Sequence, residues 1–159
     1  MLLDVRVLVA GVGNLLRGDD GFGVAVAVRL LREGVPADVR VLDIGIGGIQ
    51  LVQELHDGYD MLIVVDALDL GKPPGTLVTM RPEVAEPTGP DDLADVHYAN
   101  PARALMLAKA LGVLPETVWL VGSQPEDAGR LGDSLSEAVE RSVGPAVAEV
   151  RRLIESLEP

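Results

Sequence analysis

Two carboxylates and one histidine are the residues whose types and positions could do chemistry. Asp20 closes a glycine-rich stretch, Gly11–Gly23, that follows an apolar run. Asp66 follows an apolar run directly, and His97 lies between a polar segment and a helical pattern. A buried carboxylate at the end of a strand is costly without a positive partner. If the three side chains meet, they form a three-ligand metal site with room for a fourth ligand, as catalytic metal sites require.

These residues also have structural interpretations. Asp20 could cap the helix that follows it, and Asp66 could be a buried aspartate that backbone donors satisfy. The adjacent Asp19 can cap the same helix, so two aspartates in a row are more than capping needs. An aspartic dyad of Asp20 and Asp66 is a further alternative, but it leaves His97 without a role.

Other catalytic and cofactor sites have weaker support. The third glycine of a dinucleotide-binding G-x-G-x-x-G motif would fall at Leu16, and no P-loop lysine is present, so no nucleotide cofactor is expected. The sequence contains no cysteine, which excludes disulfides, thiolate zinc sites and a thiol nucleophile. It also lacks the G-x-S-x-G elbow of serine hydrolases. His56, at the predicted end of a helix, is interpreted as structural or solvated.

The elements that must position these residues alternate between strands and helices. Alternation at this spacing predicts a single α/β domain, residues 1–159, with helices on both faces of a mainly parallel sheet. A long loop is expected over Pro82–Asp95, and Ser134 with Glu137 is expected to form a capping box at the last helix. The expected strands are Val5–Ala10, Val39–Ile44, Met61–Val65, Thr76–Arg81 (an edge strand, antiparallel) and Thr117–Val121, and the expected helices are Phe22–Glu33, Ile49–Leu55, Ala102–Leu111 and one from Ser134 onward.

This topology brings distant carboxylates together. In open parallel sheets the ligand site lies beyond the carboxyl ends of the strands. Asp20 lies in the loop after the first predicted strand, Asp43 near the end of the second and Asp66 at the end of the third. We therefore expect these three residues to converge on one edge of the sheet.

Composition limits the partners and the location. A net charge of -12 argues against nucleic acid and anionic membranes, which need basic patches. No apolar run reaches the roughly 18 residues of a membrane span, and the first residues do not form a signal peptide. We expect a cytoplasmic protein without a membrane partner.

The motifs together resemble the hydrogenase maturation endopeptidases over nearly the whole chain. The matching features are Gly11-Val12-Gly13-Asn14 with Asp19-Asp20-Gly21-Phe22-Gly23, Asp43 before a glycine loop, Val65-Asp66-Ala67, His97 before a helix, and Gly122-Ser123-Gln124-Pro125-Glu126. The resemblance implies a three-layer αβα sandwich around a five-stranded, mostly parallel twisted sheet. It also implies a protease that cuts a short C-terminal peptide from the large-subunit precursor of a nickel-iron hydrogenase after nickel insertion.

The same resemblance implies roles for individual residues. Asp20, Asp66 and His97 fall on positions of catalytic, metal-contacting residues, and Asp43 falls on a position linked to substrate recognition. The sequence departs from the family pattern at two places. Ile44-Gly45-Ile46 stands where the family often has Gly-Gly-Thr, and Tyr98 follows His97 where the family often has Gly or Gln.

The expected cofactor is nickel that arrives with the substrate. The implied partner is the nickel-loaded large-subunit precursor, with the protease acting as a monomer. Carboxylate and imidazole are suitable ligands for Ni(II) or Zn(II). An aspartyl-type mechanism without direct metal catalysis is the mechanistic alternative. The functional alternative is a nickel-sensing chaperone that binds the same precursor without cutting it.

Overall fold

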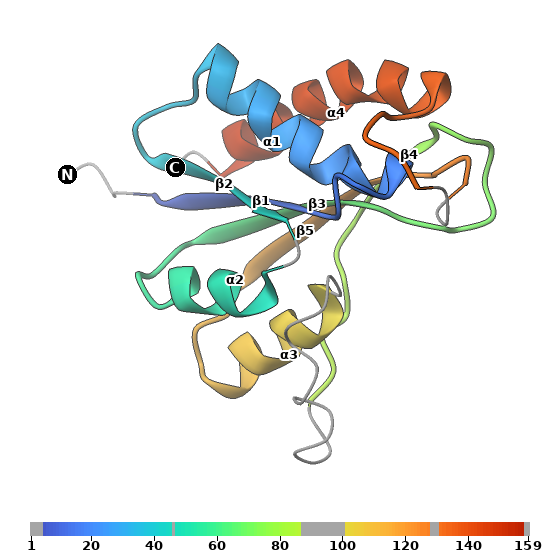
Figure 1. Cartoon of the computed structure of the whole chain (residues 1–159). Coiled ribbons are helices and arrows are strands. Elements are labelled where there is room, and N and C mark those ends of the chain that lie inside the picture. The colour runs from blue at the N-terminus through green and yellow to red at the C-terminus, as the bar shows by residue number, and fades with distance from the viewer. Residues whose placement is uncertain (1–4, 46, 87–100, 128–130, 158–159) are drawn as a thin grey trace.

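One twisted, five-stranded sheet forms the centre of the molecule (Figure 1). The computed structural model describes residues 5–45, 47–86, 101–127 and 131–157. The strands lie side by side in the order β2-β1-β3-β5-β4, and only β4 runs antiparallel to its neighbour, at the edge of the sheet. Their bounds are β1 Val7–Val12, β2 Val39–Gly45, β3 Met61–Ala67, β4 Leu77–Met80 and β5 Thr117–Ser123.

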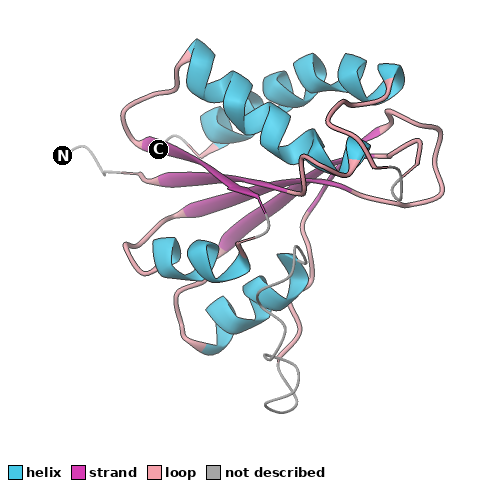
Figure 2. Cartoon of the chain, viewed as in Figure 1, coloured by secondary structure: helices cyan, strands magenta, loops and turns pink. Residues whose placement is uncertain are grey.

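Helices cover both faces of this sheet, which confirms the three-layer αβα sandwich (Figure 2). Helices α1 (Phe22–Glu33) and α4 (Glu137–Ser156) lie on one face. Helices α2 (Gly48–Leu55) and α3 (Pro101–Ala110) lie on the other. Within the described ranges, no helix is both long and apolar enough to span a membrane.

The strands are continuously apolar because each of their faces meets a helical layer. Side chains alternate between the faces of a strand. Val7 and Val9 of β1 therefore enter the core under α1 and α4, whereas Leu8 and Ala10 enter the core under α2 and α3. The core consists mainly of aliphatic side chains, and Phe22 is a fully buried aromatic residue in it.

Strand β1 continues through Gly11 to Val12, so the prediction that it ends at Ala10 was wrong. Glycine does not end this strand because it is needed there for close packing. A Cβ added to Gly11 would lie 2.4 Å from the carbonyl oxygen of Gly23, in the first turn of α1. A Cβ on Gly23 would lie 2.1 Å from the carbonyl oxygen of Val65 in β3. The start of α1 thus lies with its backbone directly against β1 and β3.

The last helix starts later than predicted. Helix α4 begins at Glu137, and its N-cap residue is Ser136, so the predicted capping box of Ser134 and Glu137 was wrong. Ser136 makes no side-chain cap hydrogen bond, because its hydroxyl donates to the distant carboxylate of Asp19. The helix then continues without a break past Pro145.

Candidate active site

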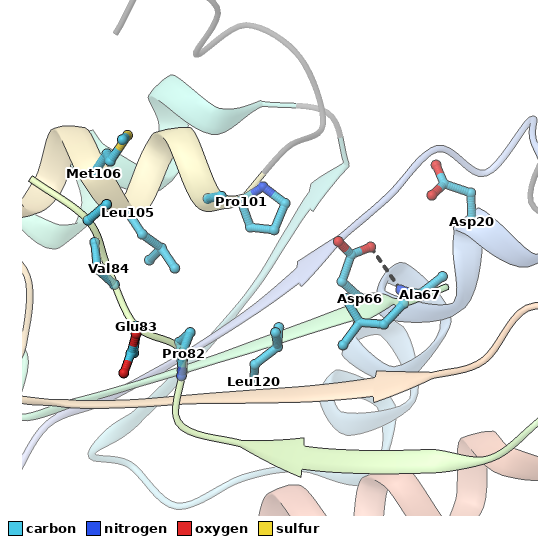
Figure 3. Close-up of a pocket in the computed structure, with 13 residues that line it drawn as sticks. Asp20, Asp66, Ala67, Pro82, Glu83, Val84, Pro101, Leu105, Met106 and Leu120 are labelled. Atoms are coloured by element: carbon cyan, nitrogen blue, oxygen red, sulfur yellow. Dashed lines mark hydrogen bonds between the residues drawn. The ribbon is translucent and has the colours of Figure 1, made fainter. Parts of the chain in front are cut away.

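A cavity of about 540 Å³ opens beside the carboxyl end of β3 and is bounded on its far side by α3 (Figure 3). Asp20 and Asp66 lie at one end of it, although they are far apart in the sequence. This confirms that the strand ends bring these two carboxylates to one place. The lining residues are Asp20, Asp66, Ala67, Leu68, Pro82, Glu83, Val84, Ala85, Pro101, Ala102, Leu105, Met106 and Leu120.

Asp66 is a buried carboxylate near the end of β3, with 6% of its surface exposed. Its Oδ1 accepts a hydrogen bond of 2.8 Å from the backbone N–H of Ala67. Burial, followed by the negative charge of Asp20, raises the pKa of Asp66 to about 8, even though the Ala67 hydrogen bond opposes the rise. A pKa of about 8 favours the protonated form of Asp66 at neutral pH.

Asp20 reaches the cavity from a tight turn between β1 and α1. It lies in a short 3-10 helix, η1 (Gly18–Gly21), and its Oδ2 accepts a hydrogen bond of 2.8 Å from the backbone N–H of Asn14. A Cβ on Gly13 would lie 1.8 Å from the carbonyl oxygen of Asp20 and 3.8 Å from Oδ1 of Asp66. Gly13 also has a φ of +137°, which favours glycine. The glycine-rich turn is thus folded around the two aspartates.

Asp19 anchors this turn from behind. Its buried carboxylate accepts hydrogen bonds from the backbone N–H of Ser136 at 2.6 Å, from the Ser136 hydroxyl at 2.8 Å and from the backbone N–H of Glu126 at 2.8 Å. The expectation that Asp19 or Asp20 caps α1 was wrong, because the N-cap residue is Gly21 and no side chain bonds there. Asp19 instead joins the turn that carries Asp20 to the start of α4 and to the loop after β5.

Gln124 performs a similar task for the loop that follows Asp66. Its Oε1 accepts from the backbone N–H groups of Leu70 at 2.7 Å and Lys72 at 3.2 Å. Its Nε2 donates to Oδ1 of Asp69 at 3.0 Å. The sequence signal for this supporting role is a polar residue placed directly after a buried strand, because Gln124 follows the end of β5 at Ser123.

Asp43 shares the carboxyl edge of the sheet but not the cavity. It is an exposed residue of β2 whose register partner is Gly11. Val41 enters the core under α1 and α4, whereas Leu42 and Ile44 pack on the side of α2 and α3. By alternation Asp43 lies on the α1 and α4 side, opposite to the face that Asp66 occupies. All three carboxylates therefore lie at the expected edge of the sheet, but only Asp20 and Asp66 line the cavity, and the role of Asp43 in recognition stays a prediction.

The third predicted ligand, His97, lies outside the described residues. The next described residue is Pro101, which lines the cavity opposite Asp66 (Figure 3). Within the described ranges, no group of three or more His, Cys, Asp or Glu residues could hold a metal ion. This part of the chain supplies a pair of carboxylates, which suits a cation that also has ligands from elsewhere. His56 is exposed at the end of α2, where its Nδ1 lies 2.9 Å from the carbonyl oxygen of Val52, in agreement with a structural role.

Known proteins with similar sequences and folds act in hydrogenase maturation. A family model described as hydrogenase maturation protease matches residues 24–153. The hydrogenase expression/formation protein HupD of Rhodobacter capsulatus is 38% identical over 148 residues, which cover 92% of this chain and 70% of that protein. The solved structure of the hydrogenase maturating endopeptidase HybD from E. coli superposes with a TM-score of 0.78 at 30% identity, covering 96% of this chain and 94% of that one. The hydrogenase 2 maturation peptidase from a Thaumarchaeota archaeon gives a TM-score of 0.73 at 38% identity, covering 94% and 98%.

Proposed function

Because the chain belongs to the hydrogenase maturation protease family and is a peptide hydrolase, we propose that it removes a C-terminal peptide from the large-subunit precursor of a nickel-iron hydrogenase. In this proposal cleavage follows nickel insertion, and the nickel belongs to the substrate. The observation that carries the proposal is the pair of carboxylates, Asp20 and Asp66, facing one cavity.

The electrostatics of this pair support recognition of a cation. Every charged side chain among the described lining residues is a carboxylate: Asp20, Asp66 and Glu83. The charge of Asp20 contributes to holding the pKa of Asp66 at about 8. A divalent cation between the two would favour the ionised form of both, so it would replace the proton on Asp66. A precursor without nickel offers no such compensation and would leave Asp66 protonated.

His97 completes the proposed ligand set. It precedes Pro101 by four positions, and a chain of that length spans at most about 14 Å. The position of Pro101 in the cavity therefore supports a histidine that reaches the carboxylates. Three protein ligands leave coordination positions for the ligands that the precursor supplies and for the scissile region.

The chemistry proposed for the site is hydrolysis of a peptide bond held next to the nickel. A divalent metal can polarise a carbonyl group and lower the pKa of a water molecule. In this scheme Asp20 and Asp66 orient the loaded precursor, and Asp66 releases its proton on binding. Asp43, exposed on the other face of the same edge, is proposed to contact the precursor beside the cavity.

The proposal also includes the setting of the reaction. We place it in the cytoplasm, in agreement with a chain that contains no cysteine, and we treat the enzyme as a monomer without a nucleotide cofactor.

Intact-mass spectrometry of the precursor tests this function. After incubation with the wild-type protein, a nickel-loaded precursor should lose the mass of a C-terminal peptide. Asp20→Asn and Asp66→Asn should each slow this loss by about 100-fold or more, in the range seen when single catalytic groups are removed. Asp57→Asn is the matched control, because Asp57 is exposed and outside the cavity.

Three outcomes would contradict the proposal. An unchanged precursor mass with stable binding would indicate the nickel-sensing chaperone instead. Loss of mass elsewhere than at the C-terminus would contradict the proposed cleavage site. Full activity of Asp66→Asn would remove the carboxylate pair from the reaction.

A further inference from the structure

Three exposed leucines lie on the surface beside the turn that carries Asp20. Leu15 and Leu16 belong to the turn between β1 and η1, and Leu131 belongs to the segment that leads to α4. They are 52%, 69% and 80% exposed, and Figure 1 shows the two segments at the same end of the sheet. Single apolar residues are common on protein surfaces, but a group of them indicates an interaction site. We call these three residues the leucine patch.

Backbone hydrogen bonds join the two parts of the leucine patch. The N–H of Gly132 donates to the carbonyl oxygen of Leu16 at 2.9 Å, and the N–H of Gly18 donates to the carbonyl oxygen of Gly132 at 2.9 Å. Arg17 and Gly132 form a parallel β-bridge, and Leu16 and Leu131 directly precede these two bridge residues. The leucines are therefore carried by adjacent chain segments, although they are far apart in the sequence.

The leucine patch is connected to the carboxylate of Asp20 through Asn14. The backbone N–H of Asn14 donates to Oδ2 of Asp20 at 2.8 Å, and Oδ1 of Asn14 accepts a hydrogen bond of 2.9 Å from the backbone N–H of Leu16. The backbone N–H of Arg17 also donates to the carbonyl oxygen of Asn14, at 3.0 Å. A protein that brings a cation to Asp20 therefore comes within reach of the leucine patch.

These hydrogen bonds hold the leucine patch in place before a partner binds. The turn is closed on itself at Asn14, joined to the segment of Leu131 at Gly132, and anchored from behind by Asp19 on Ser136. A preformed surface loses little conformational freedom on binding, so more of its contact energy appears as affinity. Exposed apolar side chains on such a fixed backbone are suited to docking a partner.

The proposed substrate can reach this surface as a folded protein. Metal binding is coupled to folding, so a precursor that has bound nickel presents the metal from a folded site. A cation held in a folded protein can reach Asp20 only if the surface around that cation rests on the protease beside the cavity. The charged residues next to the patch in sequence, Arg17 and Asp133, are of opposite sign. The expected contact is therefore apolar rather than electrostatic.

We propose that the leucine patch docks the folded body of the nickel-loaded precursor, through an apolar surface of the precursor beside its nickel site. This inference rests on the proposed function, because it requires the precursor to bring its cation to Asp20 and Asp66. It adds that the protease binds the folded part of its substrate, in addition to the nickel and the peptide that is cut. A leucine buried in such a contact changes the affinity by about tenfold or more.

Steady-state cleavage of nickel-loaded precursor by surface variants tests the docking. Leu16 and Leu131 are each replaced by Lys and by Asp, and the kcat and KM of the four variants are measured by intact mass. Both residues are largely exposed, so these substitutions do not enter the core. Leu31→Lys and Leu31→Asp are the matched controls, because Leu31 is a 54% exposed leucine near the end of α1 that lies away from Asp20. Sedimentation of each enzyme without precursor gives its oligomeric state.

Lys and Asp should have the same effect at Leu16 and at Leu131. We expect each substitution to raise KM at least about tenfold and to leave kcat within about twofold of wild type, because lost docking weakens binding without changing the reacting groups. The two Leu31 variants should match the wild-type enzyme in both constants.

Four kinetic results would overturn the inference while leaving the proposed function intact. They are an unchanged KM in all Leu16 and Leu131 variants, opposite effects of Lys and Asp at one position, a lower kcat at unchanged KM, and an equal rise in KM in the Leu31 variants. A wild-type dimer that the Leu16 or Leu131 substitutions dissociate would assign the patch to a contact between two copies of this chain, and would also overturn it. Failure of the wild-type enzyme to cut nickel-loaded precursor would overturn the proposed function, and the docking with it.

Discussion

At the scale of single residues, the site depends on a buried carboxylate, Asp66, and on the residues that hold its neighbour. The placement of Asp20 and Asp66 in one cavity could be predicted from strand ends, because that argument needs only the alternation of strands and helices. The role of Asp19 could not be predicted, because its partner Ser136 is 117 positions away in the sequence. A capping aspartate and an anchoring aspartate look the same until that partner is known.

The raised pKa of Asp66 makes the stability of the metal-free protein depend on pH. The pKa is about 8 in the folded state against 3.8 for the ordinary group, so between these values the folded protein binds a proton that the unfolded chain releases. This contribution to stability is lost as the pH rises from about 4 to 8. Asp66→Asn cannot ionise, so we expect it to be more stable than wild type at pH 8 by at least about 1 kcal/mol, or about 2–4 °C in Tm.

Thermal unfolding of metal-free protein at pH 5.5 and pH 8 measures this effect. The gap in Tm between Asp66→Asn and wild type should be larger at pH 8 than at pH 5.5, and the control Asp57→Asn should show no such change. An equal gap at both pH values would mean that Asp66 is ionised throughout this range.

At the scale of elements, close packing of α1 on the sheet determines where Asp20 lies. The periodicity of the sequence predicted both ends of α1, α2, α3 and β5 to within two residues. It misplaced the end of β1, because a glycine normally indicates a turn, whereas Gly11 lies in the strand beneath Gly23 of the helix. Contacts of this kind join segments far apart in sequence and leave no local pattern.

Gly23→Ala should therefore disturb the site by moving α1. The added Cβ would meet the carbonyl oxygens of Val65 at 2.1 Å and Val12 at 2.4 Å, and neither backbone can yield easily. We expect a loss of several kcal/mol, at the upper end of the usual range for overpacking, with lower protease activity. Gly144→Ala in α4 is the matched control, because its Cβ would meet only the flexible end of Arg29, at 3.3 Å.

Thermal unfolding of the two variants decides this prediction. Gly144→Ala should be neutral or more stable by up to about 1 kcal/mol, as alanine favours helices over glycine. Similar Tm values for Gly23→Ala and wild type would show that α1 does not depend on this contact.

At the scale of the whole molecule, the αβα sandwich brings two carboxylates from the ends of neighbouring parallel strands to one side of the sheet. The sandwich and its antiparallel edge strand could be predicted from the alternation of the elements. The face on which Asp43 lies could not, because the expected convergence considered only the edge of the sheet and not the alternation within β2. That distinction separates the cavity, which faces α3, from the exposed Asp43 on the side of α1.

The central claim is that nickel on the precursor permits cleavage, and one comparison tests it most directly. The same precursor, once loaded with nickel and once free of it, is incubated with equal amounts of the enzyme, and the rate of C-terminal cleavage is measured by intact mass. We expect the loaded precursor to be cut at least about 100-fold faster, because only its cation can replace the proton on Asp66 beside the charge of Asp20. Equal rates for the two precursors would contradict the account.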